Sequence, residues 1–154
     1  MRILLKILLG ILIIFVLIQL IPQSVNKSSQ SLPTDFIKVY SVPRQVQSIF
    51  EDACYDCHSN NTRYPWYSKI QPFRIWLDGH INTGKEELNF SEFGSYSSRR
   101  QYNKLNSIAE SVKKRTMPLR SYEWMHSEAR LNDNQKKMII KWVNDIRDSI
   151  KAKR

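Results

Sequence analysis

Apolar residues follow one another almost without interruption from Ile3 to Ile21. About nineteen residues at about 1.5 Å each span close to 30 Å, the thickness of the hydrocarbon core of a bilayer. Arg2 and Lys6 lie at the N-terminal side and predict that the N-terminus stays in the cytoplasm. No cleavage site of small residues follows, so the pattern favours an uncleaved membrane anchor over residues 1–22 rather than a signal peptide.

Polar and serine-rich sequence follows over residues 23–34 and predicts a tether. Beyond it, over residues 35–154, apolar residues recur at steps of three and four, the spacing of one face of a helix. Four helices are predicted. The first follows Pro43, with Ser41 as a possible N-cap, as far as Cys57; the second runs from Pro72 to about Gly84 or Leu88; the third covers about 98–115; and the fourth begins near Asn132 or Asp133. Their apolar spans are expected to hold Val46, Ile49, Phe50, Ala53, Cys54 and Cys57; Phe73, Ile75, Trp76, Leu77, His80 and Ile81; Tyr102, Leu105, Ile108, Ala109 and Val112; and Met138, Ile139, Trp142, Val143, Ile146 and Ile150. Because no convincing strand pattern and no internal repeat is found, we expect one all-α domain.

Composition changes this picture mainly through charge. The 154 residues suffice for one domain and an anchor, and four glycines fit a helical chain with few tight turns. A formal net charge of +10 suits an acidic partner or an anionic membrane surface. Nucleic acid is the other common partner of a basic chain, but no helix-turn-helix, zinc-finger or RNP signature is present, so we expect no nucleic-acid binding.

The chain has two cysteines, and both stand in the sequence Cys54-Tyr55-Asp56-Cys57-His58. C-x-x-C-H is the attachment sequence of c-type haem. Two thiols one helical turn apart can form thioethers with the vinyl groups of one haem, and the next residue then directs its imidazole at the iron. The motif predicts covalently attached haem c, with His58 as the proximal iron ligand.

Other chemistries of a C-x-x-C pair are less well matched. A thioredoxin-like dithiol needs a βαβ context, which the sequence lacks. A zinc site needs four ligands, and His80 and His126 would have to join the two cysteines without a second paired spacing. A disulfide-bonded domain with a chance motif is the third alternative.

Met117 is the predicted distal ligand. It precedes Pro118, which disfavours helical backbone at Met117 and places it in a loop after the third predicted helix. A thioether presented in this way is what a His/Met haem needs opposite its histidine. A methionine that fills the core, His80 as ligand, Met125 or His126 as ligand, and an open sixth position are the alternatives.

Four segments carry a resemblance to a known family. They are Cys54-Tyr55-Asp56-Cys57-His58-Ser59-Asn60, Arg63-Tyr64-Pro65-Trp66-Tyr67, Leu88-Asn89-Phe90-Ser91 and Met117-Pro118-Leu119. The chain resembles the small membrane-anchored haem-binding domains of bacteria, and the order of its elements resembles the cytochrome c fold. The family resemblance implies haem c binding over nearly all of the chain after the tether.

The expected function is that of a membrane-tethered monohaem c-type cytochrome, which binds haem and transfers electrons and is not an enzyme. The expected location is the cytoplasmic (inner) membrane, crossed once, with the domain in the periplasm. Lys113, Lys114, Arg115 and Arg120 flank Met117 and predict an acidic redox partner protein. The alternative function is a haem-based sensor or peroxidase-like protein with an open sixth coordination site, and a third is a structural or accessory haem protein in an envelope complex.

Overall fold

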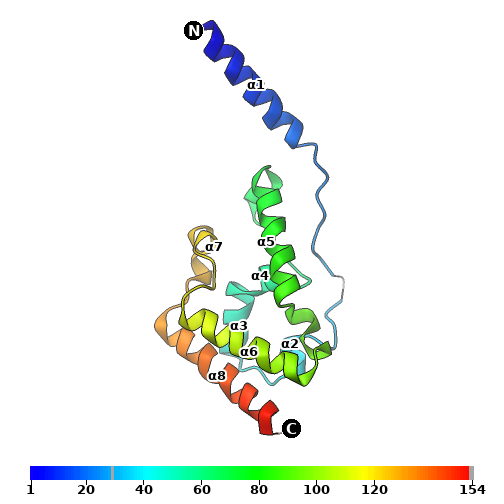
Figure 1. Cartoon of the computed structure of the whole chain (residues 1–154), viewed down its shortest axis with the longest axis vertical. Coiled ribbons are helices and arrows are strands. Elements are labelled where there is room, and N and C mark those ends of the chain that lie inside the picture. The colour runs from blue at the N-terminus through cyan, green and yellow to red at the C-terminus, as the bar shows by residue number, and fades with distance from the viewer. Residues whose placement is uncertain (29, 153–154) are drawn as a thin grey trace.

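The computed structural model describes residues 1–28 and 30–152, and within these ranges the chain forms helices and no strand (Figure 1). The all-α prediction is therefore confirmed for the described residues. The elements in chain order are α1 (Arg2–Ile18), α2 (Phe36–Val39), α3 (Arg44–Ala53), α4 (Tyr55–His58), the 3-10 helix η1 (Trp66–Lys69), α5 (Phe73–Glu87), the 3-10 helix η2 (Phe90–Ser95), α6 (Ser98–Lys113), α7 (Arg120–Met125), the 3-10 helix η3 (Ser127–Ala129) and α8 (Asp133–Ala152).

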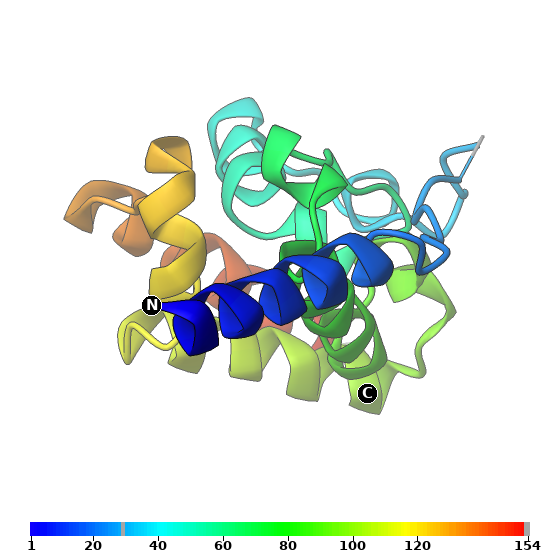
Figure 2. The ribbon, with the colours of Figure 1, turned by 90° about the horizontal axis from the view of Figure 1, so that it is seen from above.

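The first helix, α1, projects away from the other helices, and none of its residues is buried (Figure 1). Seen from above, it passes in front of the helical domain (Figure 2). It has 17 residues and ends at Ile18, whereas the apolar run continues to Ile21. Among the described residues, no helix combines the length and the apolar character needed to cross a membrane.

The predicted tether is partly docked on the domain. The Asn26 side-chain amide donates to the Ser59 carbonyl and to the Thr62 hydroxyl, both at 2.9 Å. Lys27 pairs with Asn61 in an isolated antiparallel bridge. These contacts hold the segment before residue 29 against the loop that follows the cysteine motif.

The core is built around the ring of Phe36, a fully buried residue of α2. Its ring centroid lies 4.8–5.4 Å from those of Phe50, Phe90, Phe93 and Trp142, at angles typical of tilted or edge-to-face packing. The predicted apolar faces of the long helices supply most of the rest of the core, to which Ala129 and Leu131 also belong. They contribute Val46, Ile49 and Ala53 from α3, Leu105, Ile108, Ala109 and Val112 from α6, and Ile139 and Val143 from α8.

The N-terminal cap of α8 agrees with the sequence. The Asn132 side chain accepts from Gln135 N and the Gln135 side chain accepts from Asn132 N, both at 2.9 Å. This reciprocal pair is the arrangement of a capping box. At α3, by contrast, Pro43 and not Ser41 is the cap residue.

The apolar face predicted for α5 is wrong in part. Leu77 and Ile81 are buried, but Phe73, Ile75 and Trp76 are exposed. Ile75 and Trp76 lie on the side of the helix opposite Leu77 and Ile81, and Phe73, one turn before Leu77, stands in the exposed first turn. The buried side of the first turn is occupied by Arg74, which pairs with Asp78 at 2.7 Å and lies over the Tyr64 ring.

Candidate haem site

The cysteine motif begins where α3 ends. Cys54 has φ −133° and ψ −41°, which interrupts the helix and turns the chain into the short helix α4. Both thiols are free of a disulfide. Burial raises the pKa of Cys54 to about 12, with a further contribution from Cys57, and burial raises the pKa of Cys57 to about 11. The two cysteines are therefore present as protonated thiols, one turn apart.

His58 is held in one tautomer by the backbone. Its Nδ1 lies 3.0 Å from the Leu88 carbonyl oxygen, which can only accept, so Nδ1 carries the proton. Burial lowers the pKa of His58, which favours the neutral imidazole. The lone pair then resides on Nε2. A histidine oriented in this way, through its second nitrogen, is prepared to bind a metal.

Helix α5 approaches the motif closely because residue 84 is glycine. A Cβ at Gly84 would lie 2.6 Å from the Cys57 carbonyl oxygen and 3.3 Å from the Cys57 Cβ. No side chain fits in that space without displacing the backbone. Gly84 thus fixes how near α5 comes to α4, and with it one wall of the site.

Two neighbouring cavities, of about 260 and about 280 Å³, lie beside the motif. Both are bordered by Ala53, Cys54, His58, Glu87 and Met117. The first extends between α3 and α6, where its walls include Phe50, Phe90, Ile108 and Val112. The second extends between α5 and the α6–α7 connection, where its walls include Cys57, His80, Thr83, Leu119 and Tyr122. Their linings are mainly apolar, as is usual for a cofactor pocket.

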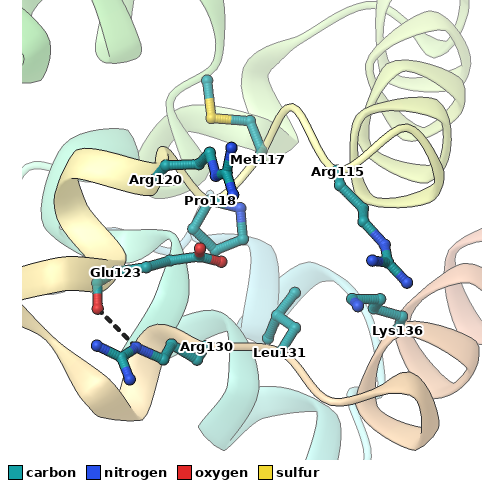
Figure 3. A pocket seen from close by; sticks show the side chains of 8 residues that line it. All are labelled: Arg115, Met117, Pro118, Arg120, Glu123, Arg130, Leu131 and Lys136. Carbon is teal, nitrogen blue, oxygen red and sulfur yellow. Dashed lines mark hydrogen bonds between the residues drawn. The ribbon is translucent and has the colours of Figure 1, made fainter.

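Met117 lies in the loop between α6 and α7, as the sequence predicts. Its side chain is 39% exposed and borders both cavities. Figure 3 shows its sulfur directed away from Glu123, Arg130 and Leu131. The structure thus brings Cys54, His58 and Met117 to the walls of the same cavities, and ligation of iron by Met117 stays a prediction.

The competing ligands are placed differently. His80 borders the second cavity, with its ring edge-on to Trp76 at 4.5 Å between centroids. Met125 and His126 border neither cavity, and His126 Nε2 lies 2.9 Å from the Tyr67 hydroxyl. In the described part of the chain, no three His, Cys, Asp or Glu side chains gather closely enough to hold a metal ion.

Asp56, inside the motif, ties the site to two other segments and was not singled out in the sequence. Its buried carboxylate accepts from Arg63 N at 2.9 Å and from the Tyr122 hydroxyl at 2.7 Å. Burial and the Asp56 carboxylate raise the pKa of Tyr122, so the phenol keeps its proton. Through Tyr122, the segment that carries the two cysteines is connected to α7, which directly follows the Met117 loop.

A third cavity, of about 480 Å³, is bordered by Met117 and Pro118 of the same loop (Figure 3). Arg115, Arg120, Arg130 and Lys136 border it, with Glu123 as its one acidic side chain. Arg130 Nε donates to the Glu123 carbonyl oxygen at 2.8 Å. Asp133 pairs with Arg115 at 3.6 Å and with Lys136 at 3.2 Å; with Asp133 counted beside Glu123, the four cations still outnumber the carboxylates, so the net charge here is positive.

The chemistry of these side chains fits haem. Two thiols, a neutral imidazole with a free Nε2 and a thioether border apolar cavities between helices, and thiol, imidazole and thioether are the groups that hold c-type haem. The helical fold and this site define a haem-binding protein.

A family model described as a haem-binding domain matches residues 13–145, and the chain belongs to that family. Comparisons with curated proteins and with solved structures gave no match. Haem binding, predicted from the sequence, is therefore confirmed at the level of the family.

Proposed function

We propose that the protein is a monohaem c-type cytochrome that carries electrons and is tethered to the cytoplasmic membrane, with its domain in the periplasm. The observation that carries this proposal is the state of the motif. Cys54 and Cys57 are free thiols one turn apart, and the His58 Nε2 is unprotonated, all at the walls of mainly apolar cavities. Membership of the haem-binding domain family supports the cofactor, and the motif supports its covalent attachment.

Each protein group has a separate role in this proposal. The two thiols would add across the haem vinyl groups and hold the haem as thioethers, and the Leu88 carbonyl keeps His58 oriented to bind the iron. Met117 would supply a soft, neutral thioether to the iron. Haem iron, when bound, would supply one-electron chemistry, and ligation by both side chains would favour electron transfer over binding of small molecules. The mainly apolar cavity walls would limit access of water to the iron.

The membrane location is a proposal that rests on α1. Its apolar side chains are exposed along the whole helix, and Arg2 and Lys6 lie in its N-terminal part. Insertion into a bilayer would cover this surface, and the cations favour a cytoplasmic N-terminus. A reporter enzyme fused after Arg154 should then be active only outside the cytoplasm. Activity of the same fusion only in the cytoplasm would refute this orientation.

The proposed partner is an acidic redox protein. Arg115 and Arg120 border the cationic hollow of Figure 3, and Met117 borders the same hollow. Lys113 and Lys114, at the end of α6, add to the charge next to this loop. Positive charge at the exposed edge of the site would steer an acidic partner toward the distal side of the haem at low salt.

The test of the proposed ligand set is spectroscopic. The oxidised wild type should show the weak near-infrared band of sulfur bound to ferric iron. Met117→Ala should abolish this band, lower the reduction potential and admit small ligands to the iron. His80→Ala, which changes a residue of the same cavity, should leave band and potential in place. If His80→Ala loses the band while Met117→Ala retains it, Met117 is refuted as the second iron ligand and His80 is assigned that role.

A second function is supported by one observation, the exposure of Met117. A side chain that is 39% exposed on a loop is more easily displaced than a buried one. If it leaves the iron, the protein has an open sixth site, as in a haem-based sensor or a peroxidase-like protein. Rapid binding of cyanide to the oxidised wild type, without the sulfur band, would favour this second function over electron transfer.

A further inference from the structure

Apolar side chains gather on the outer surface of the domain, where η1 meets α5. This apolar patch consists of Trp66, Ile70, Phe73, Ile75 and Trp76, each between 36% and 71% exposed. The outer face of a surface helix is normally polar, because only its inner face packs on the core. An exposed cluster of aromatic and aliphatic residues usually marks a surface that contacts something else.

The apolar patch is fixed to the end of α1. Gln71, between Ile70 and Phe73, donates from its backbone N to the Gln19 side chain at 2.9 Å, and the Gln19 amide donates back to the Gln71 carbonyl at 3.3 Å. The Arg74 guanidinium donates to the carbonyl of Ser24, which lies in the segment that follows α1. Figure 1 shows the beginning of α5 next to the end of α1. These hydrogen bonds place the patch beside the end of α1.

We propose that the apolar patch is the membrane-facing surface of the domain and lies in the interfacial region of the bilayer that holds α1. This inference rests on the proposed anchor. Tryptophan is enriched at membrane interfaces, where its ring fits the headgroup level, and the patch contains Trp66 and Trp76. Lys69 is exposed within the same segment and suits anionic headgroups. The position beside the end of α1 and this composition point to lipid as the occupant.

This placement sets the distance of the site from the bilayer. Helix α5 carries the patch at its start and Gly84, which contacts Cys57, near its end. Eleven residues of helix at about 1.5 Å each separate Phe73 from Gly84, a length of about 16 Å. The cysteine motif is thus held about three helical turns from the patch.

The test is photocrosslinking of the full, haem-loaded chain in vesicles of phosphatidylcholine and phosphatidylglycerol that contain an alkyne-tagged phosphatidylcholine. Photoreactive benzoylphenylalanine replaces, one at a time, Ile11 in α1, Phe73 in the patch and Lys141 on the exposed side of α8. If the Phe73 variant does not take up haem, the same substitution at Trp66, the most exposed member of the patch, replaces it. We expect tagged lipid on positions 11 and 73 and only background on position 141.

The three positions separate the possible failures. Lipid at position 11 without lipid at position 73 would overturn the membrane-facing patch and leave the anchor intact. A crosslinked dimer from position 73 without lipid would overturn it in favour of a second copy of the chain. Equal labelling of 73 and 141 would show that lipid contact is not specific to the patch. No lipid at position 11 would overturn the anchor and, with it, this inference.

Discussion

Replacing Gly84 with alanine should loosen the contact between α5 and the cysteine motif. The new Cβ would lie 2.6 Å from the Cys57 carbonyl oxygen and 3.2 Å from its carbonyl carbon. These neighbours are backbone atoms, which cannot rotate away as the end of a side chain can. Gly79 offers a matched control in the same helix, because a Cβ there meets no atom within 4 Å.

The expected magnitude follows from comparing the two variants. Alanine is more favourable than glycine inside a helix by about 1 kcal/mol, so Gly79→Ala should raise the free energy of unfolding by about this amount. Gly84→Ala has the same gain, but overpacking costs about 1–3 kcal/mol. The helix gain cancels in the comparison, and Gly84→Ala should be about 1–3 kcal/mol less stable than Gly79→Ala. In a domain of this size, that difference lowers the Tm by roughly 4–12 °C.

The assay is thermal unfolding of both full-length variants in the same detergent, followed by tryptophan fluorescence or circular dichroism. Haem content per chain is measured in parallel, since displacement of α5 should reduce haem uptake in Gly84→Ala only. An equal rise in Tm for both variants, with equal haem content, would refute the close approach of α5 to Cys57.

Two further substitutions test the surroundings of the site. Tyr122→Phe removes the donor to the buried Asp56 carboxylate and should lower the free energy of unfolding by about 1.5–3 kcal/mol in urea titrations at neutral pH. Burial, followed by the Asp56 carboxylate, raises the pKa of Tyr122 above its ordinary value of 10.0, so the unfolded chain loses the phenol proton at lower pH than the folded protein does. The free energy of unfolding of the wild type should therefore fall as the pH rises above 10.0, and that of Tyr122→Phe should fall less. An unchanged urea midpoint would contradict the bond to Asp56. Arg120→Glu should slow the reduction of ferricyanide by the protein at low salt, because it removes positive charge from the cationic hollow. The control Arg99→Glu, at the far end of α6, should not slow it. Equal slowing by both variants would refute a local effect of the cationic hollow.

The long helices were predictable because their apolar residues fall on one face. Leu105, Ile108 and Val112 in α6 repeat at the helical period, and the structure buries all three. The short helices α2 and α7, with four and six residues, hold too few residues for a period to be recognised. The face of α5 was misjudged because apolar residues stand on its exposed surface as well as toward the core, and periodicity alone does not say what covers them.

The centre of the site was predictable because Cys54, Cys57 and His58 are adjacent in sequence and their spacing has one main chemical use. Its supporting contacts were not. The His58 bond to Leu88 and the Asp56 bond to Tyr122 join residues 30 and 66 positions apart. Only the folded chain brings such pairs together, and tyrosine or a backbone carbonyl carries no local signal of its partner.

The central claim is that Cys54 and Cys57 bind one haem covalently. The most direct test expresses the full chain together with a haem-attachment system, denatures it and extracts it with acid–acetone. The mass of the extracted polypeptide is the readout. The wild type should keep its haem and be heavier by one haem, and the double variant Cys54→Ala/Cys57→Ala should release all of it. Release of all haem from the wild type into the acetone, with the bare polypeptide mass, would contradict the account.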